Sequence, residues 1–348
     1  MANECVEKSD IKKDGSRLQI IIWSVLLCVL IFFSLTLGRF PISFKDLCNW
    51  LNGAFADWPS VAESQLTYVL LKIRLPRIVL AVLAGSALAA AGAAYQGIFC
   101  NPMVSPDILG ASAGAGFGAA VGILMSLPFL GIQTTAFVLG LVAVGLSLFI
   151  TASVGRNYNV ILVLVLAGMI VSSMFTSFIA VAKYLADPYS QLPEITFWLM
   201  GSLASVDTKT MTFALPAIII GLIVLFSIRW RINIMTFGEE EAQTMGVNTK
   251  MVRLVVITGA TLITAVVVSV CGQIAWIGLV IPHLSRMIVG PGYNRLLPLS
   301  MLMGGSYLLF VDDIARTAMQ TEIPLGILTS LIGAPFFIYL LLKTGKRK

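Results

Sequence analysis

The sequence contains few of the residues that carry chemistry. Its 348 residues include one histidine, His283, and only 11% of them are charged. The five cysteines are scattered without a CxxC pair, at Cys5, Cys28, Cys48, Cys100 and Cys271. A structural zinc site requires several Cys and His ligands, and a disulfide framework requires cysteines at regular spacings. We therefore expect neither of these, and no metal or cofactor of the protein's own.

Phosphate-binding signatures are also missing. Two runs rich in Gly, Ala and Ser, 84–97 and 110–122, contain neither a GxxxxGK[ST] loop nor a GxGxxG fingerprint. Both runs lie in apolar segments, and their small residues recur at three- and four-residue spacing, which lets helix backbones approach closely in lipid. The runs therefore predict helix packing. A nucleotide site is not expected, so any energy for transport must come from a partner or an ion gradient, and the chain is not expected to be an enzyme.

Apolar side chains are abundant. Hydrophobic residues make up 58% of the chain and the mean hydropathy is +0.93, which is more apolar surface than one soluble core can bury. This predicts an all-α, polytopic membrane protein. A spanning helix needs about 20 mostly apolar residues. Ten segments meet this requirement: 18–38, 77–99, 106–126, 132–153, 160–184, 211–229, 251–271, 274–290, 296–315 and 324–342.

The basic residues predict how the chain lies in the membrane. Lys and Arg cluster in the N-terminal tail 1–17 and in the C-terminal tail 343–348, which flank a permease domain spanning 18–342. Cytoplasmic segments carry an excess of Lys and Arg, so both tails are expected inside the cell, and ten spans then place 230–250 inside as well. The net charge of +6 follows from this sidedness, so no nucleic-acid partner is implied.

Several expected spans contain helix-breaking residues, as at Gly110, Pro282 and Pro335. An interrupted helix persists in a bilayer only where protein or an aqueous cavity satisfies the freed backbone groups. These positions therefore point toward a translocation path. Ordinary kinks in a packed bundle are the alternative.

An acidic stretch, GEEEAQTMG, occupies residues 238–246 of this otherwise apolar chain. Its three glutamates suit the positive end of a short helix lying on the cytoplasmic surface. Phe237, Ala242 and Met245 recur near helical spacing and would form a docking face beside the acids. A solvated loop whose charges keep it in water is the alternative.

The acidic stretch resembles the coupling segment of the FecCD family of ATP-binding cassette (ABC) importer permeases, in which a GEEEA..LG motif fits a cleft on the ATPase subunit. Met245 stands where leucine is usual. The likeness extends over nearly the whole chain, through 74–116, FWLMGSL (197–203), GQIAWIGLVIPHLSRMIVG (272–290), DDIAR (312–316) and 322–341. The family often follows the 272–290 block with Asp-His-Arg, whereas this chain has Gly292, Tyr293, Asn294 and Arg295.

The resemblance implies a BtuC-like, type II importer permease with ten helices per subunit in a prokaryotic cell membrane. It implies a second, identical or similar permease subunit, two ABC ATPase subunits on the cytoplasmic face, and an extracytoplasmic binding protein that delivers the cargo. Members import iron siderophores, haem, cobalamin or metal oxyanions. We expect a ferric siderophore, because that cargo predominates in the family.

Functional residues follow from the same resemblance. The expected contacts with the ATPase are Glu239, Glu240, Glu241, Ala242 and Gly246. Arg74, Arg77 and Arg316 lie near the outer ends of spans, against the usual charge bias, and are expected to meet acidic residues of the binding protein. Snorkelling to lipid headgroups is the alternative for these arginines. The inner-gate candidates are Asn157, Tyr158 and Asn159.

Other motif positions are expected to be structural. The cytoplasmic turn between the second and third spans should contain Asn101, Pro102, Pro106, Asp107 and Gly110, which cap or end helices. Pro282 and His283 are expected to break a helix, since one histidine without Cys or carboxylate neighbours is a poor metal ligand set.

Two acids near the outer end of the ninth span leave another class of function open. Asp312 and Asp313 are expected to pair with Arg316 at helical spacing, although they could bind a cation or cargo. A secondary transporter coupled to protons or sodium would use such carboxylates. An intramembrane enzyme is less consistent with the sequence, because paired catalytic groups inside the spans are missing.

Overall fold

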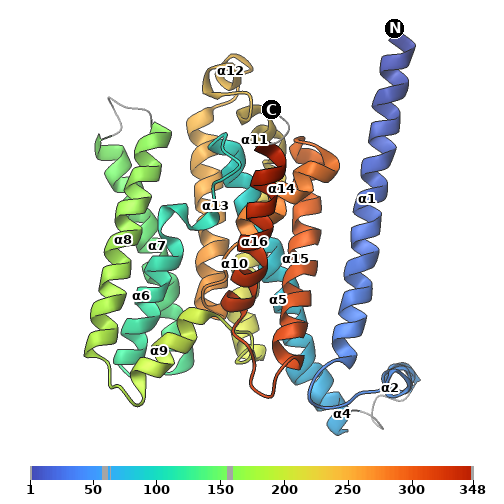
Figure 1. Cartoon of the computed structure of the whole chain (residues 1–348), viewed down its shortest axis with the longest axis vertical. Coiled ribbons are helices and arrows are strands. Elements are labelled where there is room, and N and C mark those ends of the chain that lie inside the picture. The colour runs from blue at the N-terminus through green and yellow to red at the C-terminus, as the bar shows by residue number, and fades with distance from the viewer. Residues whose placement is uncertain (1, 57–61, 63, 155–159, 346–348) are drawn as a thin grey trace.

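The computed structural model describes residues 2–56, 62, 64–154 and 160–345, and every secondary-structure element in these ranges is a helix. Figure 1 shows the long helices running side by side, with α12 and both chain ends at one end of the molecule. We call this the inner end, and the opposite end, where α2, α4 and α9 lie, the outer end.

Seven helices in the described ranges have the length and hydropathy to cross a membrane. They are α1 (Ala2–Thr36), α5 (Leu75–Ile98, preceded by α4, Gln65–Tyr68, and the π-helix η1, Val69–Arg74), α7 (Phe129–Val154), α8 (Val160–Leu185), α10 (Thr208–Ser227), α13 (Thr249–Cys271) and α15 (Tyr293–Thr317). Three further apolar helices are α6 (Ala111–Leu124), α14 (Ile277–Val289) and α16 (Leu325–Gly345). Each of the ten expected spans falls on one of these helices, and the count of ten crossings stays a prediction.

The remaining helices connect the long ones. They are α2 (Phe44–Ala56), η2 (Pro106–Leu109), α9 (Gln191–Met200), α11 (Arg229–Met235) and α12 (Glu239–Thr244). α1 begins at Ala2, so the polar segment expected as a tail continues directly into the first apolar helix.

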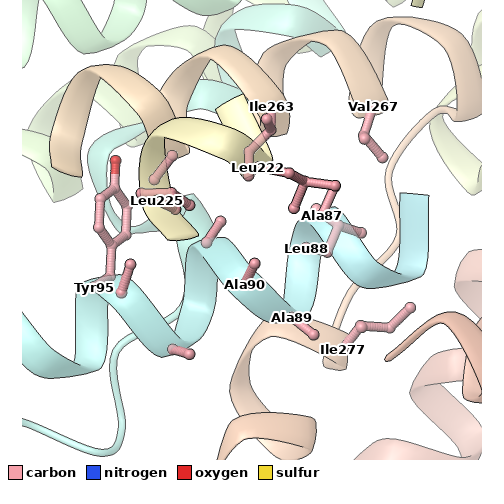
Figure 2. Close-up of a cluster of buried hydrophobic side chains, with 14 of the residues drawn as sticks. Ala87, Leu88, Ala89, Ala90, Tyr95, Leu222, Leu225, Ile263, Val267 and Ile277 are labelled. Carbon is pink, nitrogen blue, oxygen red and sulfur yellow. The ribbon is translucent and has the colours of Figure 1, made fainter. Parts of the chain in front are cut away.

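The centre of the subunit is formed by α5, which is the most buried of the long apolar helices. Figure 2 shows small α5 side chains, among them Ala87 and Ala90, on the side that faces larger side chains of α10 and α13, while Ala89 lies on the side near Ile277 of α14. α1, α7 and α8 instead expose wide apolar faces, as expected for helices in contact with lipid or with another membrane subunit.

Glycines on α5 allow two neighbouring helices to approach its backbone. A Cβ atom on Gly92 would lie 1.8 Å from the Gly278 carbonyl oxygen of α14, and one on Gly85 would lie 2.2 Å from the Gly304 carbonyl oxygen of α15. In the second small-residue run, a Cβ on Gly114 would lie 2.5 Å from a backbone oxygen of α7. The packing role predicted for both runs is confirmed.

The connection between α5 and α6 differs from the expected surface turn. Asn101 and Pro102 do lie exposed in a turn, and Asn101 Oδ1 accepts a hydrogen bond of 2.9 Å from the Met103 amide. Pro106, however, is buried against Gly278 of α14, close to the Leu88 carbonyl of α5.

η2 therefore enters the bundle and does not stay at its surface. A Cβ on Gly168 of α8 would lie 2.1 Å from the Ile108 carbonyl oxygen, so glycine makes room for the entering backbone. Asp107 accepts a hydrogen bond from the Ser112 hydroxyl of α6. Gly110, with φ 89°, turns the chain from η2 into α6, which is the interruption expected there.

The helix break expected at Pro282 and His283 is wrong, because α14 continues through both residues, and α16 likewise continues through Pro335. Proline has no N–H, so the Gly278 carbonyl lacks its usual helical donor. The Gln96 side-chain amide lies 3.5 Å from that carbonyl oxygen and 3.3 Å from the Leu279 oxygen. The break lies earlier, between Gly272 and Trp276, where both residues have positive φ.

A side-chain cap begins α10 at the outer end. The Asp207 carboxylate accepts a hydrogen bond of 2.7 Å from the Thr210 amide, and this bond lowers the pKa of Asp207. Asp207→Ala should destabilise the protein by about 1 kcal/mol near neutral pH. Because the pKa is lowered in the folded state, the difference from the native protein should shrink as the pH falls below about 4. Melting temperatures in detergent at several pH values check this, and an undiminished difference at acid pH would contradict the role of the charge.

Candidate functional site

The inner end presents a short acidic helix, α12, between two glycines. Gly238 has φ 115° and Gly246 has φ 78°, conformations that other residues rarely adopt, so glycine is required at both positions. The Val247 amide donates to the Ala242 carbonyl over 3.0 Å and closes the C-terminal end of the turn. The acidic stretch is therefore an ordered helix at the surface and not an irregular solvated loop.

Two of the three glutamates and two apolar side chains face outward from α12. Glu240 and Glu241 are exposed, and Phe237 and Met245 expose 62% and 57% of their surface. We call these four residues, with Gly246, the coupling surface. Ala242, which was expected to contact the ATPase, is fully buried and packs with the hydrophobic core. Its side chain holds α12 on the subunit and does not face a partner.

Glu239 is turned toward α13. Its Oε2 atom lies 2.7 Å from a guanidinium nitrogen of Arg253, and its Oε1 atom accepts a bond of 3.1 Å from the Thr249 hydroxyl. The Gln243 amide donates to the same Thr249 hydroxyl over 3.2 Å. Both carboxylate oxygens of Glu239 are thus engaged within the subunit, in contrast to those of its exposed neighbours.

Arg253 is buried at the inner end of α13, and its Nε atom has no hydrogen-bond partner among the described residues. The charge of Arg253 also affects the pKa of the Cys100 thiol, which lies in the connection after α5. Partial burial raises the pKa of the Cys100 thiol, and the charge of Arg253 acts in the opposite direction. Sequence patterns gave no reason to single out Arg253, because its partner Glu239 lies 14 residues away in another helix.

The outer end contains the three arginines expected to meet a binding protein, and all three are buried. Arg77 forms a two-pronged ion pair with Asp312, with distances of 2.8–3.1 Å, and a second one with Glu322 at 2.9 Å. Sequence analysis missed these pairs. Oppositely charged residues at the same end of different spans were the only signal for them.

The other two arginines bind α1 and the segment after it. Arg316 pairs with Asp313, as predicted from their helical spacing, and donates bonds of 2.6–2.7 Å to the Ser34 hydroxyl and carbonyl. Arg74 donates to the carbonyl groups of Leu35 and Phe40. The guanidinium groups of all three arginines are therefore occupied inside the subunit.

An open hollow of about 560 Å³ lies beside these arginines at the outer end. Its lining residues are Gly38, Arg39, Arg316, Thr317, Ala318, Met319 and Gln320. Arg39 is exposed and donates a hydrogen bond to the Gln320 carbonyl. Sequence analysis did not select Arg39, although it is the exposed arginine of this hollow.

The inner-gate candidates Asn157, Tyr158 and Asn159 lie outside the described residues. Among the residues that the structure does describe, no group of three or more His, Cys, Asp or Glu side chains could hold a metal ion.

The bundle of long apolar helices defines a multi-pass membrane protein, and the ordered acidic helix lies exposed at one end of it. The sequence profile of the FecCD transport family matches residues 26–343, and the chain belongs to this family. It is therefore a permease subunit of an ABC importer.

The relatives differ in cargo. The chain is 36% identical over 322 residues to the molybdate import system permease protein MolB of Haemophilus influenzae, covering 92% of this chain and 94% of MolB. It is 40% identical over 273 residues to the cobalamin import system permease protein BtuC of Halobacterium salinarum, covering 77% and 72%. It is 33% identical over 344 residues to the hemin transport system permease protein HmuU of Yersinia pestis, covering 95% and 97%.

A solved structure of a protein assigned to the metal-chelate type of ABC transporter, in an inward-facing conformation, has a TM-score of 0.83 to this chain. The two are 35% identical, and the likeness covers 93% of this chain and 98% of that one.

Proposed function

We propose that this permease carries a metal chelate, with a ferric siderophore as the first candidate, from an extracytoplasmic binding protein into the cytoplasm. Two partner ATPases drive the movement, and a second, identical permease subunit completes the path. The observation that carries the proposal is the coupling surface of α12, which lies with both chain ends at the inner end of the molecule.

The coupling surface has the chemistry of a docking site for a soluble partner. Glu240 and Glu241 would pair with basic side chains, while Phe237 and Met245 would enter an apolar cleft. A helix built only to remain in water has no need for two large exposed apolar side chains. Placing the inner end in the cytoplasm brings this surface to the compartment that contains ATP.

An ion-coupled carrier is the alternative class, and the structure gives it little support. Such a carrier would require free carboxylates, for which Asp312 and Asp313 were the candidates. Asp312 is paired with Arg77, and Asp313 with Arg316 and the Ser34 hydroxyl. Both acids are thus neutralised within the subunit.

Docking of the binding protein is proposed at the outer end, around the hollow beside Arg39. Beneath this surface, Arg74 and Arg316 bind α1, and Arg77 joins α5 to Asp312 of α15. The carboxylates of Asp312, Asp313 and Glu322 balance the charges of these arginines. An acidic lobe of a binding protein would meet the exposed Arg39.

Molybdate is a second candidate cargo, because MolB matches this chain over 92% of its length. Uptake into proteoliposomes containing the permease, its ATPase and internal ATP separates the candidates. A ferric siderophore, haem, cobalamin and molybdate are presented in turn with their binding proteins. Accumulation of the siderophore alone supports the proposal. Accumulation of molybdate alone would show that the cargo is molybdate and not a siderophore. Accumulation without the ATPase contradicts the importer mechanism.

A further inference from the structure

Adjacent glutamates of α12 have different surroundings. Glu240 and Glu241 point to solvent, whereas both carboxylate oxygens of Glu239 accept hydrogen bonds from α13, one from Arg253 and one from Thr249. The Gln243 side chain also bonds Thr249. These polar contacts of α12 converge on the first five residues of a single long helix, Thr249 to Arg253.

The α13 helix extends from this contact through the subunit. Its 23 residues correspond to about 35 Å, enough to reach from the inner to the outer end, and most of them are buried. A buried, close-packed helix moves as a unit more readily than it bends, because interior packing has little compressibility. Movement at Arg253 would therefore be carried along the helix.

The far end of α13 is joined to two other helices through backbone contacts. The Cys271 carbonyl accepts a bond of 2.8 Å from the Ser202 amide, just after α9. The Gly201 carbonyl in turn accepts a bond of 2.9 Å from the Leu325 amide, the first residue of α16. A Cβ on Gly272 would lie 2.4 Å from the Trp198 carbonyl oxygen, so the junction has no free space.

On these contacts, and building on the importer function proposed above, we infer that the Glu239–Arg253 ion pair is a positioning element. It transmits movement of α12 to α13, and through the Gly201–Gly272 junction to α9 and α16. Glu239 thus has a different role from Glu240 and Glu241: it connects the coupling surface to the membrane helices, and the other two acids contact the partner.

The Glu239–Arg253 ion pair is suited to transmit movement from α12 to α13, because it resists separation. Arg253 is buried, and the carboxylate of Glu239 is its only ion-pair partner among the described residues. Separating the two groups would leave a buried guanidinium unpaired, which is costly, so α12 and α13 should remain connected when α12 is displaced. Burial of Ala242 alone would fix the resting position of α12 without this resistance to separation.

The test compares Glu239→Gln with Glu240→Gln, the same change one residue further along the helix. Each variant is reconstituted with the ATPase and binding protein, and three quantities are measured: ATPase retained on purification, ATP hydrolysed, and cargo imported per ATP. Glu239→Gln should retain the ATPase and hydrolyse ATP, while cargo imported per ATP falls about fivefold or more. Glu240→Gln should instead weaken retention of the ATPase.

Two further variants keep the test decisive if Glu239→Gln folds poorly. Arg253→Lys preserves the charge and should retain most of the import per ATP. The exchanged pair Glu239→Arg with Arg253→Glu should recover import relative to either single change, which a double-mutant cycle quantifies.

Two outcomes would overturn the inference: unchanged import per ATP in Glu239→Gln, or loss of ATPase retention equal to that in Glu240→Gln. Failure of the importer function itself is distinguishable, because then the native protein would show no import that depends on the ATPase.

Discussion

Gly92→Ala is expected to prevent α5 and α14 from packing, although it adds only one methyl group. The new Cβ atom would lie 1.8 Å from the Gly278 carbonyl oxygen, and 2.7 Å from the Gly278 Cα atom. These are backbone atoms, which cannot rotate away as a side chain can. Separating the two helices would also remove the contacts that hold Pro106 against Gly278. We expect a loss of more than about 3 kcal/mol of stability.

Gly145→Ala provides the matched control. Gly145 is also inside a long helix, α7, but a Cβ atom there would meet no atom within 4 Å. This change should leave stability unaltered or raise it slightly, since alanine favours helix more than glycine does. Yields of monodisperse protein in detergent and melting temperatures compare the two variants. Equal behaviour of Gly92→Ala and Gly145→Ala would show that the close α5–α14 approach is incorrect.

Arg77→Met is expected to have the second large effect on stability. Asp312 is fully buried, and its short contacts are to the Arg77 guanidinium. Removing Arg77 leaves the Asp312 charge with Arg316 at 4.0 Å as its remaining cation, and frees Glu322 from its partner. Breaking a buried ion pair at one side costs about 3–5 kcal/mol, so the melting temperature in detergent should fall sharply.

Arg39→Met is the control for this prediction, because it makes the same substitution at an exposed arginine of the same end. Arg39→Met should lower the free energy of unfolding by less than about 1 kcal/mol. Adding Asp312→Asn to Arg77→Met should recover part of the loss, since the unpaired charge is then removed. A similar loss of stability in Arg77→Met and Arg39→Met would contradict the conclusion that the ion pairs of Arg77 with Asp312 and Glu322 stabilise the outer end.

The sequence was informative wherever a local pattern decides the structure. Long apolar runs placed every long helix, because lipid requires about 20 consecutive apolar residues and few other structures do. The small residues at 84–97 correctly predicted close helix approach, and the acidic stretch 238–246 correctly predicted a short helix at the surface. In each case the determining residues are neighbours along the chain.

The features that sequence analysis missed depend on contacts between distant segments. Asp312 and Glu322 lie 235 and 245 residues from Arg77, so no local spacing links them. Entry of η2 into the bundle depends on Gly168 and Gly278, which belong to other helices. Pro282 stays inside α14, where Gln96 from α5 lies close to the carbonyl that the proline leaves without its helical donor.

Within the acidic helix, composition identified the surface but not its division of roles. Three consecutive glutamates look alike in the sequence, yet a helix places successive side chains about 100° apart around its axis. Glu239 consequently faces Arg253, while Glu240 and Glu241 face solvent. For the same reason Ala242 is buried beneath them.

The central claim is that the coupling surface of α12 receives the ATPase. Its most direct test measures ATP hydrolysis in vesicles when the cargo-loaded binding protein is added, in native permease and in the double variant Glu240→Ala with Glu241→Ala. Glu194→Ala, an exposed glutamate of α9 at the outer end, is the control. The account predicts that stimulation falls about tenfold or more in the double variant and persists in the control. Full stimulation in the double variant would contradict the account.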